Sequence, residues 1–179
     1  MCFGPGCSEY IVICKRYSWE AHPLRTSTKT FSVSYMLIGE HLHTLDDKKR
    51  LSLPAKFRKE LGASVVITRG LDACLFVYSK AEWVIFSGRL AELSMGQADS
   101  RAFNRFLLAG AVESAVDKSG RILVPDFLKE FAHLEERVVV AGMYNRVELW
   151  NEKTWEVYKG RVEKQADTLA EKLGEIGMI

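Results

Sequence analysis

A stretch of this chain occurs twice, and the repeat limits the folds open to it. At a constant offset of 71 the matching pairs are Asp46–Asp117, Arg50–Arg121 and Pro54–Pro125. After a one-residue insertion the offset is 72, and the pairs are Gly70–Gly142, Trp83–Trp155, Gly88–Gly160 and Arg89–Arg161. Two copies are too few for a solenoid. We therefore predict a duplicated half that packs against its own copy.

Both copies have the same predicted order of elements. A strand, a tight turn and a return strand come first. A short helix then starts at a proline, because the first helical position needs no N–H. A second hairpin and a further helix follow. Apolar residues spaced by three and four predict two helices between the copies, broken at Gly96. The same spacing predicts one amphipathic helix in the tail. These three helices are expected at residues 81–93, 100–111 and 153–173.

The tight turns begin with Asp46 and Asp117, and an aspartate in this place can accept hydrogen bonds from the backbone two residues further on. Gly120 stands at the fourth place of the second turn, where a left-handed conformation is expected. The first turn has Lys49 there instead. A residue other than glycine costs on the order of 1 kcal/mol in that conformation, so we expect the first turn to be reshaped.

Composition excludes some classes of protein. The 179 residues suffice for one compact domain or two small intertwined ones. The net charge is +2, and the first 35 residues hold four basic and two acidic residues, so residues 36–179 are neutral. Global charge thus gives no support for a nucleic-acid partner, and such a partner must be argued from local clusters. No apolar run approaches the length of a membrane span.

Three of the four cysteines lie near the N-terminus, and only Cys74 lies in the body. This predicts no disulfide framework and a reducing compartment. A zinc site could be imagined from Cys2, Cys7, Cys14 and His22, but their spacing fits no common pattern. The alternative, which we favour, is an unmatched extension over residues 1–35 that is poorly ordered or comes from a misassigned start, with Met36 as the natural start.

No motif of an enzyme is present, so we predict a protein that is not an enzyme and that has no cofactor, no metal and no small-molecule substrate. His41 and His43 share one face of a strand and could bind a metal, but an exposed face or an interface is the simpler interpretation. Cys74 is expected to pack as a small apolar residue. Asp46 and Asp117 are expected to cap their turns rather than to act as a catalytic pair.

The two turns carry a local excess of positive charge. We predict that they bind DNA, because arginine and lysine bind phosphates and a two-stranded ribbon fits the major groove. The predicted DNA-binding residues are Lys48, Lys49, Arg50, Lys118 and Arg121. A solvated, charged turn is the alternative. Lysines and arginine of the following helix lack a full counterpart in the second copy and are interpreted as a solvated helix face; they are Lys56, Arg58 and Lys59.

Several stretches resemble the signatures of one family. The stretch IGEHLHTLDDKKRLSLPAKFRKEL resembles the opening of the MraZ family, and RAFNRFLLAGAVE, DKSGRILVP and NRVELWNEKTWEVY resemble its later signatures. The resemblance covers Met36 to about Tyr158. It implies an α+β fold: a duplicated AbrB-like (double-psi or swapped-hairpin) β-barrel pseudo-dimer with peripheral helices. The implied parts are a first repeat over 40–82, a helical linker over 83–110, a second repeat over 111–154 and a C-terminal amphipathic helix over 155–179.

The resemblance also implies a function. Members of this family are bacterial transcription regulators of the cytoplasm and nucleoid. They bind double-stranded promoter DNA at short direct repeats upstream of the division and cell-wall gene cluster, including their own promoter, and they assemble as ring homo-oligomers. No membrane partner is implied. The family's basic turn maps onto the five residues named above. Because Ser119 replaces the basic residue that Lys48 provides, we expect the first copy to be the dominant reader.

Two other classes stay open. The same fold class serves in toxin–antitoxin pairs, so an antitoxin-like or scaffolding module is one alternative, which a C-terminal arm that folds on a partner would favour. An enzyme is the other, and a pocket in which polar groups converge with His41 or Cys74 would favour it.

Overall fold

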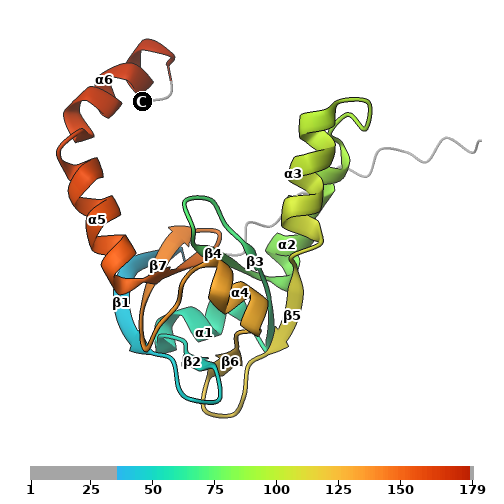
Figure 1. Cartoon of the computed structure of the whole chain (residues 1–179), viewed down its shortest axis with the longest axis vertical. Coiled ribbons are helices and arrows are strands. Elements are labelled where there is room, and N and C mark those ends of the chain that lie inside the picture. The colour runs from blue at the N-terminus through green and yellow to red at the C-terminus, as the bar shows by residue number, and fades with distance from the viewer. Residues whose placement is uncertain (1–35, 178–179) are drawn as a thin grey trace, which may run out of the picture. The chain divides into compact units, whose positions relative to one another are not determined.

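The computed structural model describes residues 36–177, so the predictions for residues 1–35 lie outside the part described. In chain order the strands are β1 (Leu37–Thr44), β2 (Arg50–Ser52), β3 (Ser64–Arg69), β4 (Leu75–Ser79), β5 (Val112–Ala115), β6 (Arg121–Leu123), β7 (Arg137–Tyr144) and β8 (Val147–Asn151). The helices are α1 (Ala55–Leu61), α2 (Lys80–Ala91), α3 (Ala98–Leu108), α4 (Asp126–Phe131), α5 (Glu152–Glu163) and α6 (Ala166–Glu175), as Figure 1 shows.

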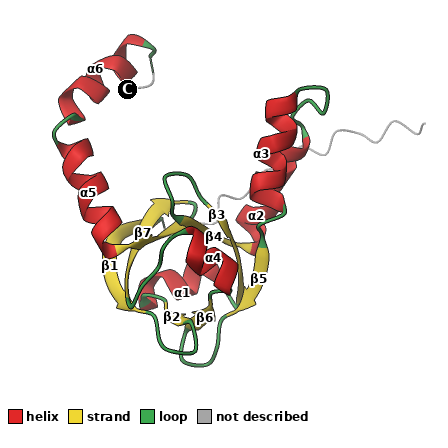
Figure 2. Ribbon diagram, viewed as in Figure 1, coloured by secondary structure: helices red, strands yellow, loops and turns green. Residues whose placement is uncertain are grey.

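The strands form a six-stranded antiparallel sheet in the order β1-β7-β8-β4-β3-β5 and a two-stranded sheet of β2 and β6 (Figure 2). The first strand of each copy pairs with the third strand of the other, β1 with β7 and β5 with β3. The predicted α+β class is therefore confirmed. Strands of both copies pair with each other in both sheets.

Strand pairing also shows an approximate twofold relation between the copies. Leu51 of β2 lies opposite Ile122 of β6, which is its own counterpart at the offset of 71. Phe76 of β4 lies opposite Glu148 of β8, its counterpart at the offset of 72. An approximate twofold axis therefore passes between the members of each pair.

The strands on either side of each tight turn differ from the prediction. We expected a return strand paired with the strand before the turn, but β1 and β2 share only one isolated bridge, between Leu45 and Leu51. Both strands form their ladders with the other copy instead. Pairing between copies buries Leu51 and Ile122 completely at their meeting point, and apolar burial of this kind is the main favourable term in folding.

The central strands of the six-stranded sheet, β7, β8, β4 and β3, are buried on both faces over most of their length. Successive residues of β7 alternate between two apolar clusters: Val138 and Val140 join the larger one, and Val139 and Ala141 the smaller one. Side chains of α2 and α5 cover the smaller cluster, namely Trp83, Phe86, Trp155 and Tyr158. Strands that are buried on both faces have nearly continuous apolar sequences. This explains the sequence Val138–Ala141.

The helices follow the prediction between the copies and depart from it in the tail. The break around Gly96 is confirmed, because α2 ends at Ala91 and α3 begins at Ala98. The single tail helix is wrong: α5 ends at Glu163 and α6 begins at Ala166. The N–H of Gln165 bonds the carbonyl of Val162 at 3.0 Å, and this tighter three-residue spacing closes the last turn of α5.

The helices α2 and α5 leave the sheet at the end opposite the two tight turns (Figure 1). The hydroxyl of Thr68 donates to the carbonyl of Leu107 at 2.6 Å and so fixes α3 to β3. The guanidinium of Arg69 lies 5.8 Å from the ring centre of Phe106 and 5.9 Å from that of Phe131. Among the helices of residues 36–177, none is long and apolar enough to cross a membrane.

Candidate nucleic-acid interface

The two tight turns have the same internal geometry. The Oδ1 atom of Asp46 accepts hydrogen bonds from the backbone N–H of Lys48 at 2.9 Å and of Arg50 at 2.8 Å. Asp117 does the same with Ser119 at 2.8 Å and Arg121 at 2.9 Å. The predicted capping role of both aspartates is thus confirmed.

The arginine of each turn binds the aspartate of the same turn. The Nε of Arg50 donates to Oδ2 of Asp46 at 2.8 Å, and the Nε of Arg121 donates to Oδ2 of Asp117 at 2.8 Å. The side-chain hydrogen bond from Arg50, followed by that from its backbone N–H, lowers the pKa of Asp46. For Asp117 the backbone N–H of Arg121 is the larger cause of a lowered pKa, and its side chain the next. Both arginines therefore help to build the turns.

The turns are also linked to each other. An Nη atom of Arg121 lies 3.8 Å from Oδ2 of Asp46, across the boundary between the copies. The two aspartates and two arginines therefore form one charge-balanced group, in which 34% of the Arg50 side chain and 29% of the Arg121 side chain remain exposed. Any contact of these arginines with DNA has to use the exposed part.

Lys49 adopts the left-handed conformation with φ at +59°, and Gly120 has φ at +75°. The closing hydrogen bonds are the same, since Lys49 N donates to Asp46 O and Gly120 N donates to Asp117 O, both at 2.8 Å. The expected reshaping of the first turn is therefore wrong. The Nζ of Lys49 instead donates to Oδ2 of Asp126, at the start of α4, at 2.6 Å.

At the equivalent place of the second turn, a side chain would displace Arg58. A Cβ atom on Gly120 would overlap the guanidinium of Arg58, which comes from α1 of the first copy. The Nε of Arg58 is held there by a 2.7 Å hydrogen bond to the carbonyl of Leu53. The space that Lys49 uses in one turn is thus filled by an arginine of the other copy beside the second turn.

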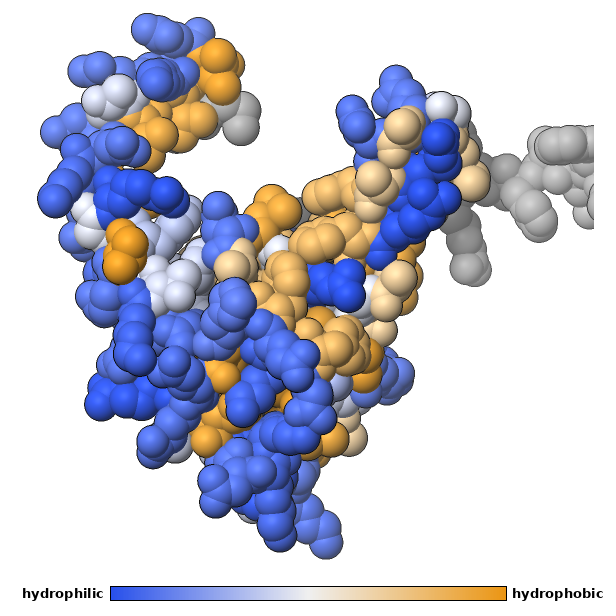
Figure 3. All heavy atoms as spheres, in the orientation of Figure 1, coloured by the Kyte–Doolittle hydropathy of each residue, from blue (hydrophilic) through white to orange (hydrophobic). Residues whose placement is uncertain are grey.

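All five predicted residues lie at one end of the domain, on the two turns beside β2 and β6 (Figure 1). Lys48 and Lys118 are exposed and make no ion pair with the residues described. Figure 3 shows that hydrophilic side chains cover this end. The structure thus leaves these two lysines available and engages Lys49, Arg50 and Arg121 with carboxylates.

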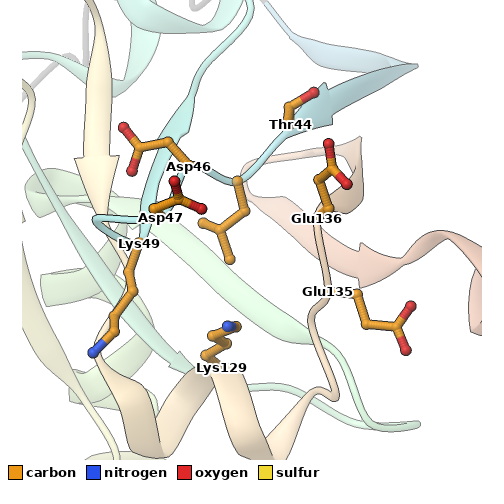
Figure 4. A pocket seen from close by; sticks show the side chains of 8 residues that line it. Thr44, Asp46, Asp47, Lys49, Lys129, Glu135 and Glu136 are labelled. Carbon is orange, nitrogen blue, oxygen red and sulfur yellow. The ribbon is translucent and has the colours of Figure 1, made fainter.

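A polar pocket of about 460 Å³ lies beside the first turn (Figure 4). Its lining includes Asp46, Asp47, Lys49, Lys129, Glu135 and Glu136. The glutamates and Lys129 come from the second copy, so their position beside the first turn could not be predicted from local sequence. The carboxylates that line this pocket disfavour the binding of a phosphate there, because like charges repel.

The side chains of His41, His43 and Cys74 pack against other parts of the domain. The ring of His41 packs edge-on against Phe57 at 5.3 Å between centroids. Burial, followed by the charges of His41 and Arg58, lowers the pKa of His43. Cys74 is 1% exposed, and burial raises the pKa of its thiol far above the ordinary value. Within the described residues, no three side chains of the metal-binding types gather as a metal site would need.

Comparison with known proteins decides the family. A protein-family model described as "MraZ protein, putative antitoxin-like" matches residues 36–106 and again residues 107–173. The chain belongs to the MraZ family. A protein named "Transcriptional regulator MraZ" from Thermoanaerobacter sp. (strain X514) is 46% identical over 143 residues, which are 80% of this chain and 100% of the relative.

Relatives in other organisms are similarly close. One of the same name from Moorella thermoacetica (strain ATCC 39073 / JCM 9320) is 49% identical over 138 residues, 77% of this chain and 96% of the relative. Another from Oenococcus oeni (strain ATCC BAA-331 / PSU-1) is 46% identical over 143 residues, 80% of this chain and 100% of the relative. Each of the two segments that match the MraZ model contains one of the tight turns.

Proposed function

We propose that this chain is a transcription regulator, not an enzyme, and that it binds double-stranded DNA through its two tight turns. The relatives with 46–49% identity cited above carry the name of a transcriptional regulator. The single observation that carries the proposal is the pair of projecting turns with one exposed lysine each, Lys48 and Lys118. Such lysines are suited to phosphates, because the ammonium group is a compact and flexible charge.

The five predicted residues then have two different roles. Lys48 and Lys118 contact phosphates. Lys49, Arg50 and Arg121 hold the turns in shape through their carboxylate partners, and the exposed parts of the arginines reach the DNA. A rigid turn helps binding, because less conformational freedom is lost when the complex forms.

We further propose the finer fold that the resemblance implies. The chain would be an AbrB-like, swapped-hairpin β-barrel pseudo-dimer, with repeats over 40–82 and 111–154, a linker over 83–110 and a C-terminal helical segment over 155–179. The approximate twofold relation and the pairing of β1 with β7 and of β5 with β3 support this proposal.

The working form would be a ring of identical subunits. Apolar side chains of α6 are exposed without a partner in the described chain: Leu169 by 40%, Leu173 by 41% and Ile176, just after the helix, by 69%. A second apolar surface on α2 and α3 exposes Phe103 by 39%, beside a pocket that Leu93 and Phe106 also line. A contact between two different surfaces is head-to-tail, and it produces a ring when the rotation between neighbouring subunits closes.

A ring also accounts for the weak net charge. One subunit with a few phosphate contacts binds weakly, but linked subunits on adjacent short direct repeats gain affinity through effective concentration. The target would be the promoter upstream of division and cell-wall genes, including the chain's own promoter. The site of action would be the nucleoid, within the cytoplasm.

The test is binding of the full chain to its own upstream DNA, with fluorescence anisotropy over a salt series and a scrambled duplex as control. The variant Lys48→Ala/Lys118→Ala is expected to bind more weakly, with a salt slope smaller by about 0.9 for each phosphate that the protein no longer neutralises. Lys80→Ala/Lys153→Ala is the control, because these lysines lie outside the turns and pair with Glu113 and Glu135. Equal binding of both variants and the wild type would contradict the proposal.

An antitoxin-like or scaffolding role is the second candidate, because the matching family model carries that description. In this case α6, which buries no residue in the described chain, would fold on to a partner protein. Specific binding to the promoter in the same assay, without any partner, favours the regulator. Binding to DNA only after a partner protein is added favours the antitoxin-like role.

A further inference from the structure

Each tight turn lies beside the short helix of the other copy. Lys49 of the first turn pairs with Asp126 of α4, and Gly120 of the second turn lies against Arg58 of α1. Backbone hydrogen bonds of 2.9 Å fix this crossed arrangement, from Leu53 N to Gly120 O and from Val124 N to Lys49 O. Any surface that reaches from a turn to its neighbouring helix therefore combines the two copies.

Two such surfaces can be compared. We define the first face as residues 46–50 with residues 126–136, and the second face as residues 117–121 with residues 55–65. The two turns have the same net charge, +1 for residues 46–50 and +1 for residues 117–121. The helical segments differ, because 126–136 carries −3 and 55–65 carries +2. The first face thus has a net charge of −2 and the second face +3.

Exposed side chains produce this difference. Lys56 and Lys59 are exposed on α1, they line one shallow pocket, and they make no ion pair with the residues described. At their places in α4 stand Phe127 and Glu130, which are exposed as well. The carboxylates of Glu135 and Glu136 add to the first face beside the pocket of Figure 4.

Distance along α1 allows its lysines to act together with the second turn. A helix rises about 1.5 Å per residue, so Lys56 and Lys59 lie within one turn of Arg58, which contacts Gly120. With about 3.6 residues per turn, both lysines are rotated away from Arg58, so a duplex would have to span from the second turn to the outer side of α1 to contact Lys118 together with these lysines. The first face offers no such positive surface, because Asp126 neutralises Lys49 and acidic residues follow.

We infer that the second face is the main surface for duplex DNA, with Lys56 and Lys59 as phosphate contacts additional to the turns. The first face is acidic and therefore contributes less to DNA binding. A subunit with approximate twofold symmetry then binds DNA in one orientation only. This rests on the proposed function, and it replaces the expectation that the first copy is the dominant reader.

If each subunit binds DNA in one orientation, the arrangement of its DNA sites is restricted. A symmetric module reads the two strands equally and fits an inverted repeat, as symmetric dimers do. A subunit with one basic and one acidic face repeats its orientation from site to site, and this suits direct repeats. The charge difference between the faces would therefore select the arrangement of the sites.

The experiment measures binding of the full chain to a duplex of its own upstream DNA over a salt series. Lys56→Gln/Lys59→Gln is expected to lower the salt slope by about 1.8 for each subunit bound to the duplex, which corresponds to two phosphate contacts per subunit. Arg89→Gln/Lys164→Gln is the matched control, because both residues are exposed, lie outside both faces and change the net charge equally. The control is expected to keep the slope of the wild type.

A second arm tests the orientation. Glu130→Lys places on α4 a lysine where α1 has Lys59 at the offset of 71. The wild type is expected to prefer two direct repeats over the same repeats with one inverted, and Glu130→Lys is expected to reduce that preference. An unchanged preference in this variant would overturn the claim that charge sets the orientation.

The outcomes separate this inference from the proposed function. If Lys48→Ala/Lys118→Ala weakens specific binding while Lys56→Gln/Lys59→Gln behaves like its control, the inference fails and the proposed function stands. If the wild type does not prefer its upstream DNA over a scrambled duplex, both fail. A slope lowered equally by the α1 variant and its control would also overturn the inference, since it would reflect net charge alone.

Discussion

Asp46 and Asp117 each satisfy two backbone N–H groups and one arginine of their turn. Hydrogen bonds to a charged carboxylate are stronger than those between neutral groups, so each aspartate stabilises its turn most when ionised. The pKa of both carboxyls is accordingly lowered. Protonation thus weakens the same turns that carry the exposed lysines.

This makes the stabilising contribution of Asp46 dependent on pH. A lowered pKa in the folded state means that the contribution is complete above the ordinary aspartate pKa of about 3.9 and is lost as the pH falls through the folded value. Asp46→Asn is therefore expected to have a lower urea midpoint than the wild type at pH 5–8. The difference should shrink as the pH falls below about 4. Urea unfolding at several pH values measures it.

Asp47→Asn is the control for that series, because Asp47 is the exposed neighbour in the same turn and its side chain accepts no hydrogen bond within the described residues. Its urea midpoint should follow the wild type at every pH. A constant gap between Asp46→Asn and the wild type down to pH 3 would show that the carboxylate charge does not stabilise the turn.

Lys49 shows how two small effects offset each other at one residue. The left-handed conformation of a residue other than glycine costs about 1 kcal/mol. The ion pair with Asp126 is half-exposed, and such pairs contribute roughly 0–1 kcal/mol. The two terms nearly cancel, which explains how a lysine can stand where the second turn has glycine without a change in the turn's hydrogen bonds.

At the scale of elements, the pairing of β1 with β7 depends on a glycine. Gly142 of β7 lies opposite Gly39 of β1. A Cβ atom on Gly142 would lie 2.6 Å from the backbone carbon of Leu37 and 2.7 Å from the nitrogen of Ile38. Backbone atoms in a ladder cannot move apart without breaking hydrogen bonds. The pairing of β1 with β7 therefore requires glycine at position 142.

Gly142→Ala is therefore expected to destabilise the fold by about 1–3 kcal/mol, the usual cost of extra atoms in a packed region. Urea unfolding gives the free energy, and amide hydrogen exchange should show faster exchange in Leu37–Thr44. Gly88→Ala is the control, since Gly88 lies in α2 and an added methyl group would meet no atom within 4 Å apart from its chain neighbours and the nearby backbone of its own helix. It should stabilise by about 0.5–1 kcal/mol. Two equal effects would contradict this account of β1.

At the scale of the whole molecule, apolar side chains of α6 and of the α2–α3 region are exposed. Scattered apolar residues are normal on a surface, but apolar residues grouped on one helix mark a contact site. The orange surfaces on these helices in Figure 3 illustrate the grouping. The proposed ring would cover both surfaces, because α6 of each subunit would pack against the α2–α3 surface of its neighbour.

Leu169→Glu is expected to release monomers, because a charge buried in an apolar contact costs several kcal/mol. Native mass spectrometry or light scattering after gel filtration measures the change. Leu42→Glu is the control: Leu42 is 48% exposed on β1 and Leu169 is 40% exposed on α6. The control should keep the oligomer of the wild type. Assembly that survives in Leu169→Glu would exclude α6 from the subunit contact.

The sequence by itself determined the features that depend on near neighbours. The duplication is visible from matching residues 71 and 72 positions apart. The order of elements, the break around Gly96 and the capping by Asp46 and Asp117 follow from residues a few positions apart, because turn and helix chemistry is local. The same patterns placed the five candidate residues on the two tight turns.

Only the tertiary structure decided which parts of the two copies meet. Lys49 and Asp126 are 77 positions apart, and no local pattern predicts that they pair or that Arg58 lies against Gly120. The strands beside each turn pair with the other copy, and this pairing buries Leu51 and Ile122 completely, whereas a short isolated hairpin is at best marginally stable. That crossing places the lysines of α1 beside the second turn and the carboxylates of α4 beside the first.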